Sequence, residues 1–159
     1  MDQPRPGVEL LSPDRGGTPT VRLTRIVEFH AGHEIRRADW TPEQNAEHFG
    51  RASQLHSHTY QCHVTVSGAL HPTAGGVVRL AELDALLKRE VTDRFEGKTV
   101  HEGAPEFGPG GWLSTGEALS VYLWGRISGA LPPGVRLHAI RVQEGPQLYS
   151  EYFGESAGG

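Results

Sequence analysis

The sequence predicts an α+β fold with an antiparallel sheet. Segments of alternating apolar residues lie toward both ends of the chain, and two segments with helical periodicity lie between them. The predicted order is β, β, α, α, β, β, and strands grouped outside the helices favour this fold class. A length of 159 residues suits one domain with a real core.

Four segments read as strands. Residues 21–30 are rich in β-branched side chains and alternate in polarity, and residues 59–70 alternate in the same way. Two further strands are expected over residues 135–144 and 148–153, joined by Gly145-Pro146.

Helical spacing predicts two main helices. Apolar residues recur at this spacing over residues 80–91, and again from Leu119 to Leu131, where Pro132-Pro133-Gly134 ends the second helix. Ser114 or Thr115 can cap that helix. A short helix is possible after Thr41-Pro42, and residues 93–113 are expected to be a loop rich in Gly and Pro.

Composition limits the class of protein. Fifteen basic against nineteen acidic residues give a net charge of −4, which argues against nucleic acid as a partner. No apolar run approaches the roughly 20 residues of a membrane span. The single cysteine, Cys62, fits a cytoplasmic location. Residues 1–20 are expected to form a flexible arm, residues 21–154 one domain, and residues 155–159 a tail.

The unusual feature is the histidine content. Six of the nine histidines lie between His30 and His63. His56 and His58 would leave the same face of a strand, and strand pairing would bring His33 toward them. Three neutral imidazoles with an open fourth position describe a catalytic zinc site. The alternative is that these are exposed loop histidines, or core rings satisfied by backbone carbonyls.

Several short motifs, in one order, carry a resemblance. The chain resembles the 6-pyruvoyltetrahydropterin synthase and 6-carboxytetrahydropterin synthase family over about residues 21–154. The motifs that carry it are Phe29–His33, His56–Tyr60, Gly76–Val78, Ser114–Glu117, Val121–Trp124, Val142–Glu144 and Tyr152–Glu155.

The resemblance implies a tunnelling fold, in which a four-stranded antiparallel sheet carries two helices on one face. It further implies that subunits assemble into an oligomeric barrel, a trimer or a hexamer, with active sites between subunits. The implied cofactor is Zn²⁺, held by His33, His56 and His58. Glu144 corresponds to the glutamate that binds the guanidine-like edge of a pterin, and a carboxylate suits that edge because it accepts two parallel N–H bonds. Thr115 matches a substrate-contacting threonine, although it could equally be a plain helix cap.

The chain departs from the family at the residues that transfer protons. The family uses a cysteine thiolate, and Ala52 stands at that position in Phe49-Gly50-Arg51-Ala52. The histidine of an Asp-His pair, expected near Asp93, is replaced by Arg94. Alanine cannot abstract a proton. Cys62 is expected in the core, where free thiols are commonly inert. The candidate replacement groups are His101, Asp93, Glu47 and His48.

These observations leave two functions open. The first is a zinc-dependent lyase or cyclase with non-standard catalytic groups, which acts on a small pterin-like or otherwise guanidine- or carbonyl-bearing substrate in a specialised pathway. Arg79 could serve an extra acidic group of that substrate. The second is a non-catalytic binding protein that keeps the fold and the metal site. If the three histidines bind no zinc, the chain could instead be a plain assembly module.

Overall fold

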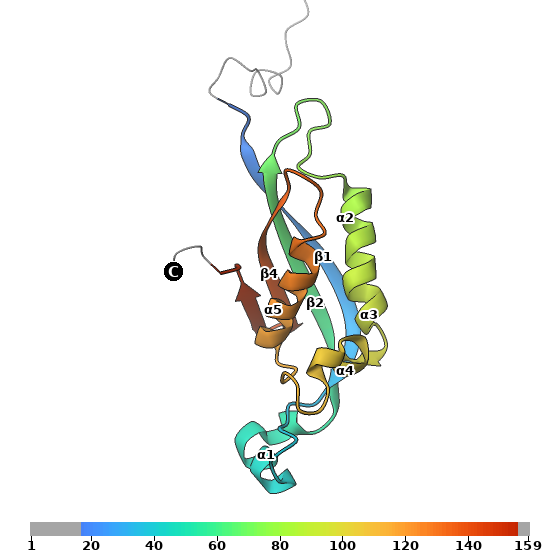
Figure 1. The fold of residues 1–159 in the computed structure, drawn as a ribbon, viewed down its shortest axis with the longest axis vertical. Helices are drawn as coiled ribbons and strands as arrows, with labels where there is room; N and C mark the ends of the chain where they lie inside the picture. The colour runs from blue at the N-terminus through green and yellow to red at the C-terminus, as the bar shows by residue number, and fades with distance from the viewer. Residues whose placement is uncertain (1–16, 156–159) are drawn as a thin grey trace, which may run out of the picture.

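Two long strands form the centre of the sheet in the computed structural model, which describes residues 17–155 (Figure 1). Strand β1 (Thr20–His33) and strand β2 (His56–Ala69) have the alternating, β-branched pattern of half-buried strands. They pair antiparallel along their whole length, from Thr20 opposite Ala69 to His33 opposite His56. The α+β prediction is confirmed, and both strands extend beyond their predicted bounds toward the histidines.

The sheet has five strands rather than the four that were predicted. Its order is β3-β1-β2-β4-β5, with β4 at Arg136–Gly145 and β5 at Leu148–Tyr152. The extra strand, β3 (Lys98–Thr99), pairs parallel with β1 through Ala31 and Gly32. It lies in the segment 93–113 that was expected to be a loop. Two residues are too few to produce an alternating pattern, so no periodicity marks this strand in the sequence.

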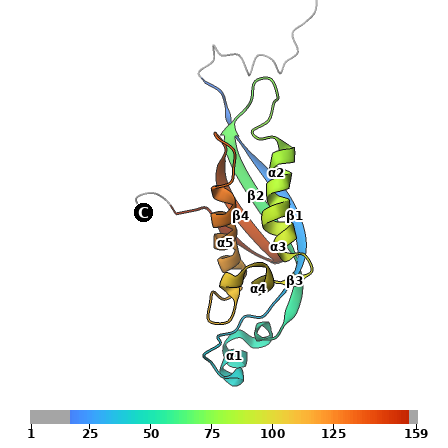
Figure 2. The same cartoon turned by 45° about the vertical axis from the view of Figure 1, so that its right-hand side comes forward.

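Two helical segments cover one face of the sheet, as predicted (Figure 2). The first is α2 (Leu80–Leu87), which continues through a π-helical turn, η3 (Lys88–Thr92), into α3 (Asp93–Phe95). The second is α5 (Gly116–Ser128), capped by the Thr115 side chain, which accepts a hydrogen bond from the Ala118 N–H. Between them lie α4 (Val100–Gly103) and the 3₁₀ turn η4 (Pro105–Phe107).

The core lies between this helical layer and the sheet. Helix-facing side chains of the strands are fully buried, and each contributes about 1.5–3 kcal/mol through burial of apolar surface. They include Phe29, Val64, Val66, Ile140 and Val142. Cys62 belongs to the same set, and burial raises the pKa of its thiol to about 12. The prediction that Cys62 is a core residue is therefore confirmed.

A small lobe extends from the end of the sheet where β1 ends and β2 begins (Figure 1). It contains α1 (Pro42–Phe49) and the 3₁₀ turn η2 (Gly50–Ser53). Thr41 and Gln44 form a capping box at the start of α1. The side chain of Asn45 is buried and bonds to both backbone groups of Arg37, which fixes the chain that leaves His33.

The ends of the chain lie partly beyond the described residues. Most of the expected arm, residues 1–16, and most of the expected tail, residues 156–159, fall outside them, while Thr20 already belongs to β1. Within residues 17–155, no helix is both long and apolar enough to cross a membrane.

Candidate metal centre and its pocket

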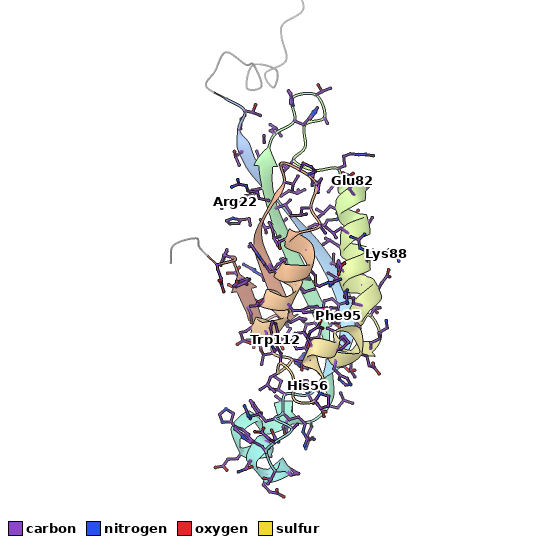
Figure 3. All side chains as sticks on the ribbon, viewed as in Figure 1. Arg22, His56, Glu82, Lys88, Phe95 and Trp112 are labelled. Carbon is purple, nitrogen blue, oxygen red and sulfur yellow. The ribbon has the colours of Figure 1, made fainter. Side chains whose placement is uncertain are left out.

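Strand pairing brings the three predicted histidines together. His33 is the last residue of β1 and lies opposite His56, the first residue of β2, while His58 lies opposite Ala31. All three side chains point to the helix-covered face, because residues two apart in a strand share a face. One ring nitrogen from each lies within 4.8 Å of the other two. Figure 3 places His56 at the end of the sheet nearest the α1 lobe.

Backbone carbonyls orient two of the rings. The Nδ1–H of His33 donates to the Ser114 carbonyl at 2.7 Å, and the Nδ1–H of His56 donates to the Gln54 carbonyl at 2.7 Å. These bonds leave Nε2 as the free acceptor, which is the usual arrangement around metal-ligating histidines. His33 Nε2 is buried and has no hydrogen-bond partner among the described residues. A buried orphan nitrogen facing two other imidazoles fits a divalent cation with a preference for nitrogen ligands.

Burial favours the metal-binding form of two of the rings, His33 and His58. The pKa of His33 is lowered to about 4, mainly by burial and to a smaller extent by the nearby His56 and His58, against the opposing effect of the bond to Ser114. Burial and His56 likewise lower the pKa of His58. His33 is therefore a neutral imidazole near neutral pH, and neutral imidazole is the species that coordinates a metal ion.

Glu144 lies beside the triad near the end of β4. Its Oε1 is 3.9 Å from His33 Nε2, which is too long for a hydrogen bond. Because His33 is neutral, the two side chains do not form an ion pair either. Burial raises the pKa of Glu144, and the charge of Glu117 raises it further. The carboxylate therefore lies in a nearly buried position where bound N–H donors would stabilise its charged form.

Gly116, the first residue of α5, makes room for this carboxylate. A Cβ atom at Gly116 would lie 2.8 Å from Glu144 Oε2 and 3.2 Å from Ser150 Oγ. A distance of 2.8 Å is below any ordinary carbon–oxygen contact, so a side chain here would displace the glutamate. The glycine in the Ser114–Glu117 motif is thus part of the site.

A cavity of about 600 Å³ opens next to the triad and is large enough for a small molecule. It shares His33 and Ser114 with the metal centre. Its wall also contains Glu34 and Arg36 from the chain after β1, His101 from α4, and Trp112 from the loop before α5. The predicted proton-transfer candidate His101 is thereby placed at the same cavity as His33.

Of the other predicted site residues, some lie near the triad and some do not. Thr115 directly follows Ser114, and its hydroxyl caps α5. Arg79 precedes α2 at the opposite end of the sheet from His56, next to the Glu82 end of that helix (Figure 3). Asp93 is exposed and forms an ion pair with Lys88 at 2.9 Å.

Glu47 and His48 belong to α1, in the lobe, and neither lines the cavity. His48 packs instead against the rings of Trp40 and Phe49. Within one chain the structure thus gathers His101 and Thr115 near the triad, but not Arg79, Asp93, Glu47 or His48.

Three residues of the site were not predicted from the sequence. Glu34 directly follows His33, and Trp112 stands in an aperiodic stretch, so neither had a pattern that marked it. Tyr60, the last residue of the His56–Tyr60 motif, is buried directly beside the triad and had no role assigned.

The sequence of the chain is similar to one family model and to named proteins. A sequence model described as 6-pyruvoyl tetrahydropterin synthase matches residues 22–155. The chain is 30% identical over 145 residues to the 6-pyruvoyl tetrahydrobiopterin synthase of Poecilia reticulata, covering 88% of this chain and 97% of that protein. It is 29% identical over 136 residues to the human protein of the same name, covering 84% of this chain and 92% of that protein.

A solved structure agrees at the level of the fold. The 6-pyruvoyl tetrahydropterin synthase of Caenorhabditis elegans superposes with a TM-score of 0.78 at 24% identity, covering 87% of this chain and 98% of that chain. The family match spans most of the chain and includes the triad and Glu144. The chain therefore belongs to the 6-pyruvoyl tetrahydropterin synthase family.

Proposed function

We propose that this protein is a zinc-dependent lyase or cyclase that acts on a small molecule with a pterin-like, guanidine-bearing ring. The observation that carries the proposal is the separation of 3.9 Å between His33 Nε2 and Glu144 Oε1. A metal centre and an anchor for N–H donors are therefore adjacent, and His33 of that centre lines the cavity of about 600 Å³. Membership of the family, whose matched relatives are named as synthases, supports a role in pterin-type biosynthesis.

The three imidazoles and the carboxylate have separate tasks. His33, His56 and His58 hold the zinc, which supplies Lewis acidity toward a carbonyl or hydroxyl oxygen of the substrate when it is bound. Glu144 accepts two N–H bonds from the guanidine-like edge and so fixes the orientation of the ring. Thr115, at the start of α5, contributes a substrate contact in addition to its cap.

Proton transfer is assigned to His101. Alanine at position 52 has no acid or base, so another group must act if the protein is an enzyme. His101 lines the cavity together with His33, and an imidazole suits proton transfer near neutral pH. Asp93, Glu47 and His48 do not line this cavity and remain secondary candidates, which would need a neighbouring copy of the chain to bring them close.

Assembly of several copies belongs to the proposal. The pairing of β3 covers only Ala31 and Gly32 of the outer edge of β1, and β5 ends the sheet on the other side. Among residues 17–155, the rest of that β1 edge and the outer edge of β5 have no strand partner, and such edges suit the closed barrel of a trimer or hexamer. In such an assembly Arg79 of one copy could reach an acidic group of a substrate bound by another.

A second candidate function is a non-catalytic pterin-binding protein. The loss of the thiolate at Ala52 favours it, because that change removes a reacting group and leaves the triad and Glu144 in place. A shared fold does not decide between catalysis and binding.

The deciding experiment incubates the zinc-loaded protein with dihydroneopterin triphosphate and with dihydroneopterin, and follows binding and products. The lyase proposal predicts turnover that is lost in Glu144→Ala and reduced about 10²-fold or more in His101→Gln. Binding without any product supports the second candidate. Absence of both binding and turnover contradicts the pterin-like substrate.

A further inference from the structure

The Tyr60 hydroxyl is a buried polar group without a partner. The residue is 1% exposed, and its hydroxyl oxygen forms no hydrogen bond with any of the described residues. Leaving a hydroxyl unpaired in an apolar interior destabilises a folded protein, so such groups are uncommon and call for an explanation.

The ring of Tyr60 is held in one orientation. It stacks on Phe29 with centroids 5.0 Å apart and planes 7° from parallel. His58 and His33 approach it at steep angles, with centroid distances of 5.4 Å and 5.9 Å. A ring packed in this way cannot turn its hydroxyl toward a different partner without breaking the core.

The same residue lies next to the carboxylate anchor. Gln61 of β2 pairs with Gln143 of β4, so Tyr60 and Glu144 are the next residues along the two neighbouring strands. A tyrosine hydroxyl carries a proton that it can donate, so Tyr60 offers a hydrogen-bond donor beside the Glu144 acceptor.

We propose that Tyr60 is a positioning residue that selects the ligand: its O–H donates a hydrogen bond to an acceptor on the ligand whose N–H edge is held by Glu144. The ligand class is a cyclic amidine or guanidine ring with a carbonyl oxygen or ring nitrogen close to its N–H groups. Glu144 accepts hydrogen bonds from the N–H groups of such a ring, and Tyr60 donates one to the neighbouring acceptor. This inference rests on the proposed function and adds a second recognition contact to it.

The test is the Tyr60→Phe variant, which removes only the hydroxyl. Binding of dihydroneopterin to the zinc-loaded protein is measured by calorimetry, with Tyr122→Phe as the matched control. Tyr122 is a second buried tyrosine of the same core, which packs on Phe95 and Phe107. We expect Kd to rise about 3- to 10-fold in Tyr60→Phe and to stay unchanged in Tyr122→Phe, with zinc content unaltered in both.

A thermal measurement on the ligand-free protein tests the same proposal separately. Removing an unpartnered hydroxyl should leave the melting temperature of Tyr60→Phe unchanged or raise it by about 2–4 °C. Failure to fold, or a clear fall in melting temperature, would mean that the hydroxyl has a structural partner, and would overturn the proposal.

The binding outcomes separate this proposal from the proposed function. Wild-type protein that binds dihydroneopterin while Tyr60→Phe binds it equally well overturns the role of Tyr60 alone. Wild-type protein that does not bind it overturns the proposed function and the role of Tyr60 together.

Discussion

His33 donates a hydrogen bond from Nδ1–H to the carbonyl oxygen of Ser114 over 2.7 Å, although 81 positions separate the two residues in the sequence. This bond joins the end of β1 to the residue that precedes the Thr115 cap of α5. It turns the His33 Nε2 toward His56 and His58, and it brings the start of α5, with Gly116, against Glu144. The metal centre and the carboxylate anchor therefore depend on the same junction.

Replacing Gly116 by alanine should damage ligand binding without unfolding the protein. The new methyl group would meet Glu144 Oε2 at 2.8 Å and move the carboxylate away from its position beside His33. We expect the Kd for dihydroneopterin to rise about 10-fold or more, comparable with loss of a hydrogen bond to a charged group.

Gly125→Ala is the matched control, because a Cβ at that position in the same helix meets nothing within 4 Å. It should leave binding unchanged and stabilise the protein by up to about 1 kcal/mol through helix propensity. Wild-type affinity in Gly116→Ala would show that the close contact is relieved without moving Glu144.

Removing the charge of Glu144 should weaken ligand binding and spare the metal. Glu144→Gln replaces one carboxylate oxygen by an amide donor, so it cannot accept two N–H bonds in parallel. We expect the Kd for dihydroneopterin to rise about 10- to 100-fold, with zinc content unchanged. Glu151→Gln, which alters a carboxylate paired with Arg141 on the neighbouring strand, serves as the control. Equal affinities of the two variants would refute the anchor.

The stability of the metal-free protein should depend on the titration of His33. Burial lowers its folded pKa to about 4 from an ordinary value of 6.5, so between these values the unfolded chain binds the extra proton. The stabilising contribution is complete above about pH 6.5 and is lost as pH falls toward 4. We expect chelator-treated protein to lose about 2–3 kcal/mol of unfolding free energy over this window.

Denaturant titrations at several pH values measure this loss, and His33→Gln is the comparison variant. The pH dependence should be clearly weaker in His33→Gln, because the glutamine side chain does not titrate. An identical pH dependence in both proteins would mean that His33 is accessible to protons in the folded state.

Cys62 should prove dispensable for chemistry. The thiol is fully buried, and burial raises its pKa to about 12, so almost no thiolate forms near neutral pH. Cys62→Ala should lose about 1–2 kcal/mol of stability from the small cavity it creates, while turnover and zinc content stay at wild-type levels. Turnover that disappears in a folded, zinc-loaded Cys62→Ala protein would transfer the proposed catalytic role from His101 to the thiol.

Those parts of the fold that have a long periodic pattern could be predicted from the sequence. The two central strands alternate over many residues, and Thr41 and Thr115 sit where helix caps are expected, so these elements were confirmed close to their predicted bounds. The short strand β3 and the helix α4 fell in a stretch assigned to a loop, because packing against β1 stabilises them rather than any pattern of their own.

In the candidate site, too, only the features that depend on a periodic pattern could be predicted from the sequence. The triad followed from strand parity and pairing, which depend on a period of two. The position of Arg79 at the far end of the sheet could not be predicted, because the location of a helix start relative to a distant strand end is set by tertiary packing. The roles of Gly116 and Tyr60 emerge only from distances between side chains on different elements.

The most direct test of the metal centre is the zinc content of purified protein, compared between His56→Ala and His63→Ala. Both changes remove a histidine from β2, but His56 belongs to the triad and His63 lies on the opposite face beside Gln61. We predict about one zinc per chain in the wild type and in His63→Ala, and a loss of bound zinc in His56→Ala. Zinc retained in His56→Ala, or absent from a wild-type protein supplied with it, would contradict the metal centre.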